Sequence, residues 1–465
     1  MAKQKPSIPK GTRDFGPDKM VRRNYIFNTI RSVFEKFGFL PLETPTMENL
    51  SVLTGKYGDE GDQLLFKILN SGDFTEDATH QDFDKGHKHL TPIIAKKGLR
   101  YDLTVPFARY VVMNRNDIAF PFKRYQIQPV WRADKPQKGR YREFYQCDAD
   151  VVGTNSLLCE AEIVMMINEV FGKFKLNDYD IKINNRKILT GITEAIGAEG
   201  RESDFCVAID KLDKIGQEKV LNELRQKGFS DEAVDKTKPV LEFKGNLEET
   251  IAFLKELFGA NSETPTSSTG IKGIEELEEV FNYLSAYGHS PEELNVDFDI
   301  TLARGLSYYT GAIFEVKVNN VEIGSVSGGG RYDNLTGVFG LDGTSGVGFS
   351  FGVDRIYDVL EALDLFPVEN LVSTQVMIVQ FDKQAGLHAV GLVKKLREAE
   401  IKSELYPEAN KLKKQMTYAN KKNIPFVILV GSNEIESQRY ALKNMAEGNQ
   451  EELTIDEIID KLSKQ

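Results

Sequence analysis

Two runs of strand-forming residues, separated by a short loop, place the strongest constraint on how this chain folds. The first run, FPFKRYQIQPVWR, begins at Phe120, and the second extends from Tyr141 to Val152. Both are rich in aromatic and β-branched residues, while ADKPQKG between them supplies the proline and glycine of a connecting loop. The pattern predicts a long antiparallel hairpin.

Side chains of the second run should alternate between the two faces of the hairpin. One face carries mixed charge around an aromatic ring, and its residues are Arg140, Arg142, Phe144, Gln146, Asp148 and Asp150. The other is mainly apolar, with Tyr141, Tyr145, Cys147, Ala149 and Val151. Arg132 and Arg140 flank the loop and could grip a polyphosphate, since guanidinium groups match phosphate oxygens bidentately. Phe144 could stack on a base, and a solvated strand face is the alternative interpretation.

Length and composition indicate a soluble protein of several domains. A chain of 465 residues exceeds what one hydrophobic core usually supports, so we expect two or three domains. It shows no secretory signal and no run of membrane-spanning length, which predicts a cytoplasmic protein with no membrane partner. The net charge of −11 argues against indiscriminate nucleic-acid binding, although a local basic patch can still act. The three scattered cysteines predict packing thiols.

Changes in residue character divide the chain into four parts. The N-terminal part contains a predicted helix at 18–38, mainly strands and loops from about 60 to 152, and a buried helix from Leu157. Charged amphipathic helices follow and resemble an insertion, after which strand and glycine character returns. The last part has the short apolar runs VMIV and FVILVG, typical of buried parallel strands in a small α/β domain. The expected boundaries are 1–171, 172–295, 296–365 and 371–465.

The usual phosphate-binding loops are missing from the sequence, so an ATP site would have to be built from other groups. Arg304 in LARGLSYYTG and Arg355 in GFSFGVDRI join the two hairpin arginines as candidates. The glycine-rich GSVSGGGRYDNLTG either lets a ligand approach the backbone or packs tightly in a sheet. HQDFDKGHKH indicates a solvated loop, and we predict no metal site in the protein itself.

Several of these segments together resemble the class II aminoacyl-tRNA synthetases. Trp131, Arg132, Asp134, Arg140, Phe144 and Asp148 are similar to motif 2 of that class. GVGFSFGVDRI resembles motif 3, and the helix and extended segment at 18–48 resembles the dimer-forming motif 1. LARGLSYYTG, SGGGRYD and YDLTVPFAR resemble the signatures of the histidyl-tRNA synthetase family.

The resemblance implies a fold and a reaction. The fold is an α+β catalytic domain with a mixed, mainly antiparallel sheet, a helical insertion and a C-terminal α/β anticodon-binding domain. In the reaction, L-histidine attacks ATP to form histidyl-adenylate, and the histidyl group is transferred to the 3′ end of tRNA(His). ATP is a substrate, and Mg²⁺ would bind through its phosphates. Catalysis would rest on alignment and charge stabilisation by arginines.

The resemblance also assigns site residues. Arg132, Arg304 and Arg355 are the expected catalytic residues, and the ATP contacts are Arg132, Arg140, Phe144, Arg304 and Arg355. The histidine contacts are Asp102, Thr104, Gln146, Asp150, Tyr308, Tyr309 and Tyr332. A neutral imidazole offers one N–H donor and one acceptor nitrogen, for which Asp150 and Tyr309 are the expected partners. Such a site rejects analogues by about 10⁴-fold or more, so we assign the insertion no editing role.

Binding of tRNA and self-association follow from the same resemblance. Lys411, Lys413 and Lys414 lie in a lysine-rich stretch and are the candidate tRNA contacts, with a solvated helix face as the alternative. The motif 1-like segment predicts a homodimer. One rival is a catalytically inactive, synthetase-like protein that binds histidine and regulates a partner. A second rival is a class II synthetase for threonine, proline or glycine.

Overall fold

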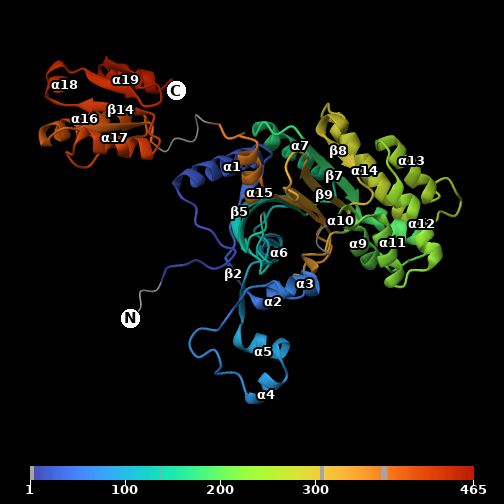
Figure 1. Ribbon diagram of the computed structural model, residues 1–465. Coiled ribbons are helices and arrows are strands. Elements are labelled where there is room, and N and C mark those ends of the chain that lie inside the picture. The colour runs from blue at the N-terminus through green and yellow to red at the C-terminus, as the bar shows by residue number, and fades with distance from the viewer. Residues whose placement is uncertain (1–4, 138, 304–307, 368–373, 465) are drawn as a thin grey trace. The chain divides into compact units, whose positions relative to one another are not determined.

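The computed structural model describes residues 5–137, 139–303, 308–367 and 374–464. It forms two compact units, the first made of residues 1–14 and 26–365 and the second of residues 15–25 and 366–465. Figure 1 shows the helices and strands of both units.

A sheet of eight strands forms the centre of the first unit in its described part. In spatial order the strands are β1 (Leu40–Pro41), β5 (Phe122–Trp131), β6 (Glu143–Val152), β11 (Gly346–Gly352), β10 (Ser327–Tyr332), β9 (Ala312–Val318), β7 (Tyr179–Asn185) and β8 (Val296–Phe298). The five pairings from β5 to β7 are antiparallel, whereas β1 and β8 pair in parallel at the edges. The predicted mixed, mainly antiparallel sheet is confirmed.

The predicted hairpin is the pair β5 and β6. Its register runs from Phe122 opposite Val152 to Trp131 opposite Glu143, so ten residues of each strand face one another. Cys147, Ala149 and Val151 are buried, as their predicted apolar face requires. The hairpin confirms the interpretation of the two strand-forming runs, including the loop between them.

Helices pack over this sheet and around it. The described helices of the first unit are α1 (Pro17–Lys36, shared with the second unit), α2 (Leu50–Leu53), α3 (Gly58–Gln63), α4 (His80–Asp84), α5 (His87–Ile94), α6 (Thr104–Met113), α7 (Leu158–Lys173), α8 (Arg186–Ala195), α9 (Glu202–Ile209), α10 (Leu212–Ile215), α11 (Gln217–Gln226), α12 (Asp231–Glu242), α13 (Leu247–Leu257), α14 (Ser268–Ala286) and α15 (Val353–Ala362), with 3₁₀ turns at Glu292–Leu294 and Gly337–Phe339. Phe171 of α7 lies edge-on to Phe351 of β11, with ring centroids 5.8 Å apart. The buried helix expected from Leu157 is therefore α7, and it packs against the sheet.

The helical segment differs from its predicted boundary at 172. Strand β7 lies inside the interval expected to be helical and pairs with both β9 and β8 of the main sheet. Its alternate residues Ile181 and Ile183 are buried, which is the period of a strand and not of a helix. Helices α8 to α14 follow β7, and Figure 1 shows α9 to α14 grouped beyond one end of the sheet. The division into four domains stays a prediction.

The interval from 60 to 113 also contains more helix than expected. In α6 the buried residues Val105, Ala108 and Val111 recur every three residues, the spacing of one helix face, so the prediction of strands and loops was wrong there. HQDFDKGHKH forms α4 and the start of α5 instead of a loop. Short strands β2 (Met47–Asn49), β4 (Lys97–Leu99) and β3 (Lys67–Ile68) make a separate small sheet.

The second unit has its own sheet and core. Its described strands, in spatial order, are β13 (Ser403–Leu405), β12 (Val376–Gln380), β14 (Phe426–Val430), β15 (Tyr440–Asn444) and β16 (Gln450–Leu453). Its helices are α16 (Lys383–Glu398), α17 (Leu412–Lys421), α18 (Ser432–Ser437) and α19 (Ile455–Leu462). The predicted apolar strands β12 and β14 pair in parallel and are buried on both faces, by α16 and α19 on one side and α17 on the other.

Two further sequence predictions concern single residue types and membrane segments. All three cysteines are free and buried, which confirms that they are packing thiols. Within the described ranges, no helix combines the length and apolar character needed to cross a membrane.

An aromatic cluster at Phe34 anchors α1 to the sheet of the first unit. The Phe34 ring lies 5.8 Å from Tyr125 of β5 and 6.0 Å from Phe351 of β11, and its side chain is fully buried. We expect Phe34→Ala to lower the free energy of unfolding by about 3–5 kcal/mol, because it leaves a cavity. Urea denaturation followed by fluorescence of Trp131, the one tryptophan in the sequence, measures this change. Phe83→Ala, at an exposed ring, is the control and should change little; equal midpoints for the two variants would contradict the packing argument.

Candidate active site

Two adjoining cavities open on one face of the main sheet. The outer cavity, of about 320 Å³, and the inner cavity, of about 150 Å³, share Arg132, Gln146, Tyr309, Gly328 and Ser350 in their walls. Phe144 lines the outer cavity and Asp148 and Asp150 the inner one, as their shared strand face requires. Strand β6 therefore runs along both cavities and presents a different chemistry to each.

The outer cavity is lined by arginines from separate parts of the chain. Arg132, Arg140 and Arg355 lie there together with Phe144, as the sequence predicted. Arg132 lies over the rings of Tyr101 and Phe144, with its guanidinium carbon 4.3 and 5.2 Å from their centroids. Arg355 donates to the carbonyls of Gly139 (3.0 Å) and Ser325 (2.6 Å), which joins motif 3 to the hairpin loop.

The other two predicted arginines are Arg140 and Arg304. Arg140 is half-exposed and lies 3.6 Å from the Asp134 carboxylate, so its guanidinium group faces solvent at the cavity mouth. Arg304 lies outside the described residues. Even without it, three guanidinium groups line the cavity wall, together with the carboxyl groups of Asp134, Glu315 and Asp354.

The inner cavity brings together all seven predicted histidine-contacting residues. They are Asp102, Thr104, Gln146, Asp150, Tyr308, Tyr309 and Tyr332. Rings of Tyr308 and Tyr309 pack edge to face at 5.0 Å, and Tyr308 packs similarly on Tyr332 at 6.1 Å. These rings form an aromatic part of the cavity wall, and the Tyr332 hydroxyl contacts one of the carboxylates, Asp150.

Buried acceptors in this cavity have no hydrogen-bond partner among the described residues. Asp102 Oδ1 accepts from the Tyr57 hydroxyl at 3.0 Å and from the Val105 N–H at 3.1 Å, but Asp102 Oδ2 accepts from none. Gln146 Oε1 and Asp148 Oδ1 are likewise unpaired. Because an unpaired buried acceptor is costly, the three together favour a ligand with several N–H donors.

Burial also perturbs the carboxyl groups. It raises the pKa of Asp102, Asp148 and Asp150 above the ordinary value, because a low-dielectric surrounding disfavours the charged form. The Arg124 guanidinium opposes this rise for Asp148 and Asp150, and Arg132 opposes it for Asp102. A cationic ligand would stabilise the ionised carboxylates further, so the cavity is suited to an ammonium group.

Asp150 is held from two sides. The Arg124 guanidinium lies 2.9 Å from Asp150 Oδ2, and the Tyr332 hydroxyl donates to Asp150 Oδ1 at 2.7 Å. Arg124 stands directly opposite Asp150 in the β5–β6 register. Sequence reasoning missed Arg124 and also Tyr57, although an alignment of the two hairpin strands would have placed Arg124 beside Asp150.

The glycine-rich strands make room for the side chains of the cavity. A Cβ atom added at Gly348 would lie 2.1 Å from Asp150 Oδ1, and one at Gly346 would lie 2.4 Å from the Tyr332 ring. A Cβ at Gly330 would come within 2.9 Å of Tyr309. Within the predicted glycine-rich segment, Gly330 packs tightly in the sheet, whereas Gly328 and Gly329 line the cavities. Approach of a ligand to this backbone stays a prediction.

The candidate tRNA contacts lie in the second unit. Lys411 precedes α17 and Lys413 and Lys414 lie in its first turn, all three exposed. Lys414 Nζ is 4.0 Å from the Glu408 carboxylate, a long surface pair that leaves the lysine open to solvent. Their role stays a prediction, because exposure alone does not distinguish an RNA contact from a solvated helix face.

Comparisons with known proteins match both units of this structure. A family model described as "Histidyl-tRNA synthetase" matches residues 94–356, and one described as "Anticodon binding domain" matches residues 375–465. The chain is 60% identical to a histidine–tRNA ligase of Cytophaga hutchinsonii over 99% of its length and 100% of that relative. It is 58% identical to one of Phocaeicola vulgatus over 98% of both chains. The crystal structure of histidyl-tRNA synthetase from Nostoc sp. PCC 7120 superimposes with a TM-score of 0.83 at 31% identity, covering 99% of this chain and 100% of that one.

The antiparallel sheet with its arginine-lined cavity, together with these matches, defines a class II aminoacyl-tRNA synthetase with a C-terminal anticodon-binding domain. Sequence identity of 58–60% over at least 98% of each relative identifies the family within this class. The chain belongs to the histidyl-tRNA synthetase family. The rival synthetases for threonine, proline or glycine, and the inactive regulatory protein, are not favoured.

The glycine at 348 provides a test of the cavity wall. We expect Gly348→Ala to destabilise the first unit by about 1–3 kcal/mol, because the new methyl group overlaps Asp150 and forces the strands apart. Gly172→Ala, in α7 with open space around it, is the matched control and should stabilise by up to about 1 kcal/mol. Thermal unfolding of the two variants beside the unmodified protein measures both changes. A Gly348→Ala protein as stable as the control would contradict the close contact with Asp150.

Proposed function

We propose that the chain performs the histidine–tRNA ligase reaction of its family with ATP in the outer cavity and L-histidine in the inner one. The unpaired acceptors beside an arginine-lined cavity are the observation that carries this proposal. An amino acid presents an ammonium group to the acceptors and a carboxylate to the arginines. Arg132 lines both cavities, so the attacking carboxylate and the α-phosphate would meet beside its guanidinium group.

The histidine ammonium group is bound by Asp102, Gln146 and Thr104. Asp102 Oδ2 and Gln146 Oε1 are the unpaired acceptors, and the Thr104 hydroxyl stands beside them in the cavity wall. Tyr57 and the Val105 N–H hold the other Asp102 oxygen, which orients the free one. Truncation of Asp102 would therefore weaken the binding of any amino acid, and not only that of histidine.

The imidazole is bound between Asp150 and Tyr309. Asp150 accepts from the ring N–H, and the Tyr309 hydroxyl donates to the bare nitrogen, with Tyr308 and Tyr332 enclosing the ring. Arg124 and the Tyr332 hydroxyl keep Asp150 oriented, and Arg124 favours its ionised form. This polar pair gives selectivity, because an amino acid without the two complementary nitrogens leaves it unsatisfied.

ATP is bound by the arginines of the outer cavity. Phe144 stacks on adenine, Arg132 and Arg304 contact the α-phosphate, and Arg355 with Arg140 contacts the distal phosphates. Mg²⁺ would bind through the ATP phosphates and neutralise part of their charge, and an ion that stays largely hydrated would need no protein cage.

The second unit carries the proposed tRNA contacts. We infer that tRNA(His) is held at its anticodon by the second unit, with Lys411, Lys413 and Lys414 on the phosphate backbone. Because tRNA is the substrate, we place the reaction in the cytoplasm.

ATP–pyrophosphate exchange tests this function directly. The unmodified protein should exchange label only with ATP and L-histidine, and not with threonine, proline or glycine. Transfer of labelled histidine to tRNA(His) then tests the second step. Exchange with another amino acid, or none with histidine, would refute the assignment.

Substitutions of the imidazole partners should separate the two substrates. We expect Tyr309→Phe to raise the KM for histidine by an amount equivalent to about 1–3 kcal/mol, since one buried hydrogen bond is lost. Asp150→Asn should cost more, because it also removes the charge paired with Arg124. In exchange assays the KM for ATP should stay near that of the unmodified protein in both variants. Equal losses for histidine and ATP would mean that these residues do not form the histidine site.

The edge of the main sheet supports the proposed homodimer. Strand β1 lies at that edge, and its Leu40 side chain is 60% exposed. We expect sedimentation velocity at micromolar concentration to give twice the mass of one chain, and Leu40→Asp to shift the protein towards monomer. Leu69→Asp, at a leucine that is 50% exposed and directly follows β3 of the separate small sheet, is the control. A monomer with full exchange activity would contradict the dimer.

A further inference from the structure

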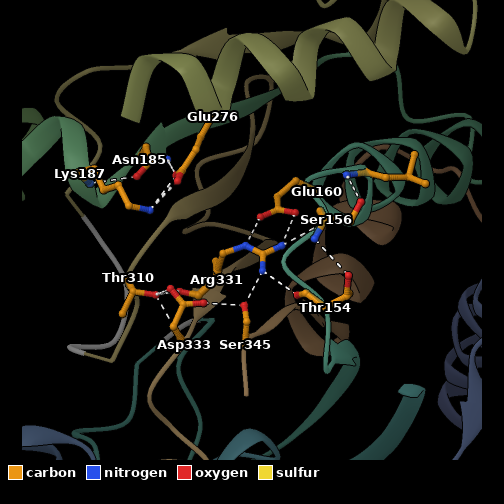
Figure 2. Close-up of polar contacts among 11 residues, drawn as sticks. Thr154, Ser156, Glu160, Asn185, Lys187, Glu276, Thr310, Arg331, Asp333 and Ser345 are labelled. Atoms are coloured by element: carbon orange, nitrogen blue, oxygen red, sulfur yellow. Dashed lines mark hydrogen bonds and ion pairs between the residues drawn. The ribbon is translucent and has the colours of Figure 1, made fainter. Parts of the chain in front are cut away.

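Arg331 is a buried arginine outside both cavities, although it follows the glycines that line them. Its guanidinium group forms a bidentate pair with Glu160 in the first turn of α7, with Nε 2.5 Å from Oε1 and Nη2 2.7 Å from Oε2 (Figure 2). Both side chains are almost completely buried. Arg331 also donates to the carbonyls of Thr154 and Ser156, in the loop that follows β6, at 3.2 Å each. The end of β10 is therefore tied to α7 and to the exit of β6.

Hydroxyl groups extend this pairing across the ends of the strands, as Figure 2 shows. Arg331 Nη1 donates to Ser345 Oγ at 2.6 Å, and Ser345 donates to Asp333 Oδ1 at 2.6 Å. Thr310 donates to the other Asp333 oxygen, also at 2.6 Å. Two backbone N–H groups connect the same segments. The Thr310 N–H donates to the Arg331 carbonyl at 2.8 Å, and the Asp333 N–H donates to Thr310 Oγ1 at 3.1 Å.

The five side chains of this network do not line the inner or the outer cavity, but their neighbours in the chain do. The network consists of Glu160, Arg331, Ser345, Asp333 and Thr310, none of which is in either cavity wall. Tyr309 directly precedes Thr310, and Tyr332 lies between Arg331 and Asp333. Both tyrosines line the inner cavity, and Tyr332 orients Asp150 through its hydroxyl. A shift of the network would therefore move both imidazole partners assigned above.

A network whose Arg331–Glu160 pair is buried and whose carboxylate oxygens are all hydrogen-bonded is suited to hold such a geometry. Each carboxylate oxygen of Glu160 and of Asp333 accepts a hydrogen bond, so neither carboxylate gains from another rotamer. Binding that needs two tyrosine side chains in fixed places is weakened when their backbone can relax. The network therefore acts on affinity for the imidazole without touching it.

We propose that the Glu160–Arg331–Ser345–Asp333–Thr310 network positions Tyr309 and Tyr332 and thereby sets selectivity for histidine. The five are positioning residues, and the proposal rests on the assignment of the inner cavity to histidine. Thr310 is the most informative member, because its hydroxyl links the segment that carries Tyr309 to the one that carries Tyr332.

Thr310→Val tests the proposal with a change of one hydroxyl for a methyl group. We expect the KM for histidine in ATP–pyrophosphate exchange to rise about five- to tenfold, the size of one lost side-chain hydrogen bond in a partly buried site. The KM for ATP should stay within about twofold, because the arginines of the outer cavity are untouched. Thr310→Ser keeps the hydroxyl and should restore the KM for histidine. Thr75→Val is the matched control, since the Thr75 hydroxyl also donates to an aspartate at 2.6 Å but far from the cavities in the chain.

The outcomes separate a positioning role from a merely structural one. A structural role would reduce the amount of active protein, lowering kcat for both substrates and leaving both KM values unchanged. Ser345→Ala is the second variant, which cuts the link between Arg331 and Asp333 and should also raise the KM for histidine alone. An unchanged KM for histidine in both variants, with a normally active unmodified protein, overturns this inference only. Unmodified protein that does not exchange with histidine overturns the proposed function, and the inference with it.

Discussion

The ion pair between Arg124 and Asp150 joins the two strands of the central hairpin at the floor of the inner cavity. The two residues stand opposite each other in the register, and both side chains are almost fully buried. A buried ion pair has a large desolvation cost, and removing one partner leaves an uncompensated charge in the interior. This pair fixes the position of the Asp150 carboxylate. The Tyr332 hydroxyl donates to that carboxylate, and its closeness requires glycine at position 348.

Charge is distributed unequally between the two cavities, and this division organises the site. Three arginines line the outer cavity beside Asp134, Glu315 and Asp354. Asp102, Asp148 and Asp150 line the inner one, with Arg132 in its wall and the buried Arg124 next to Asp150. Asp102 and Asp148 form no ion pair with another described residue, and burial raises the pKa of both carboxyl groups. A ligand that is cationic at one end and anionic at the other completes both cavities, and an amino acid beside a nucleoside triphosphate has this distribution. Arg132, in both walls, lies where the two ligands would join.

Much of the site could be predicted from one strand. Alternation along residues 143–152 correctly grouped Phe144, Gln146, Asp148 and Asp150 on one face, because the period of a strand is two irrespective of its surroundings. Arg124 was missed because its partner depends on register, which a single strand does not encode. Tyr57 was missed for a similar reason, since it lies 45 residues before Asp102 and contacts it only after the chain has folded. Helix α6 was taken for strand and loop because its short apolar run fits either period.

The order of residues is enough to predict the hairpin, the apolar strands of the second unit and the family, since local propensity, alternation and motif spacing are properties of neighbouring residues. The folded chain was needed to show that β7 belongs to the main sheet and that Arg331 joins α7 to the ends of three strands. The folded chain was also needed to show which buried acceptors have no donor among the described residues, because the donors nearest to a carboxylate come from distant segments. Burial and cross-strand pairing are set by contacts between residues far apart in the chain, and the cavity is made of such contacts.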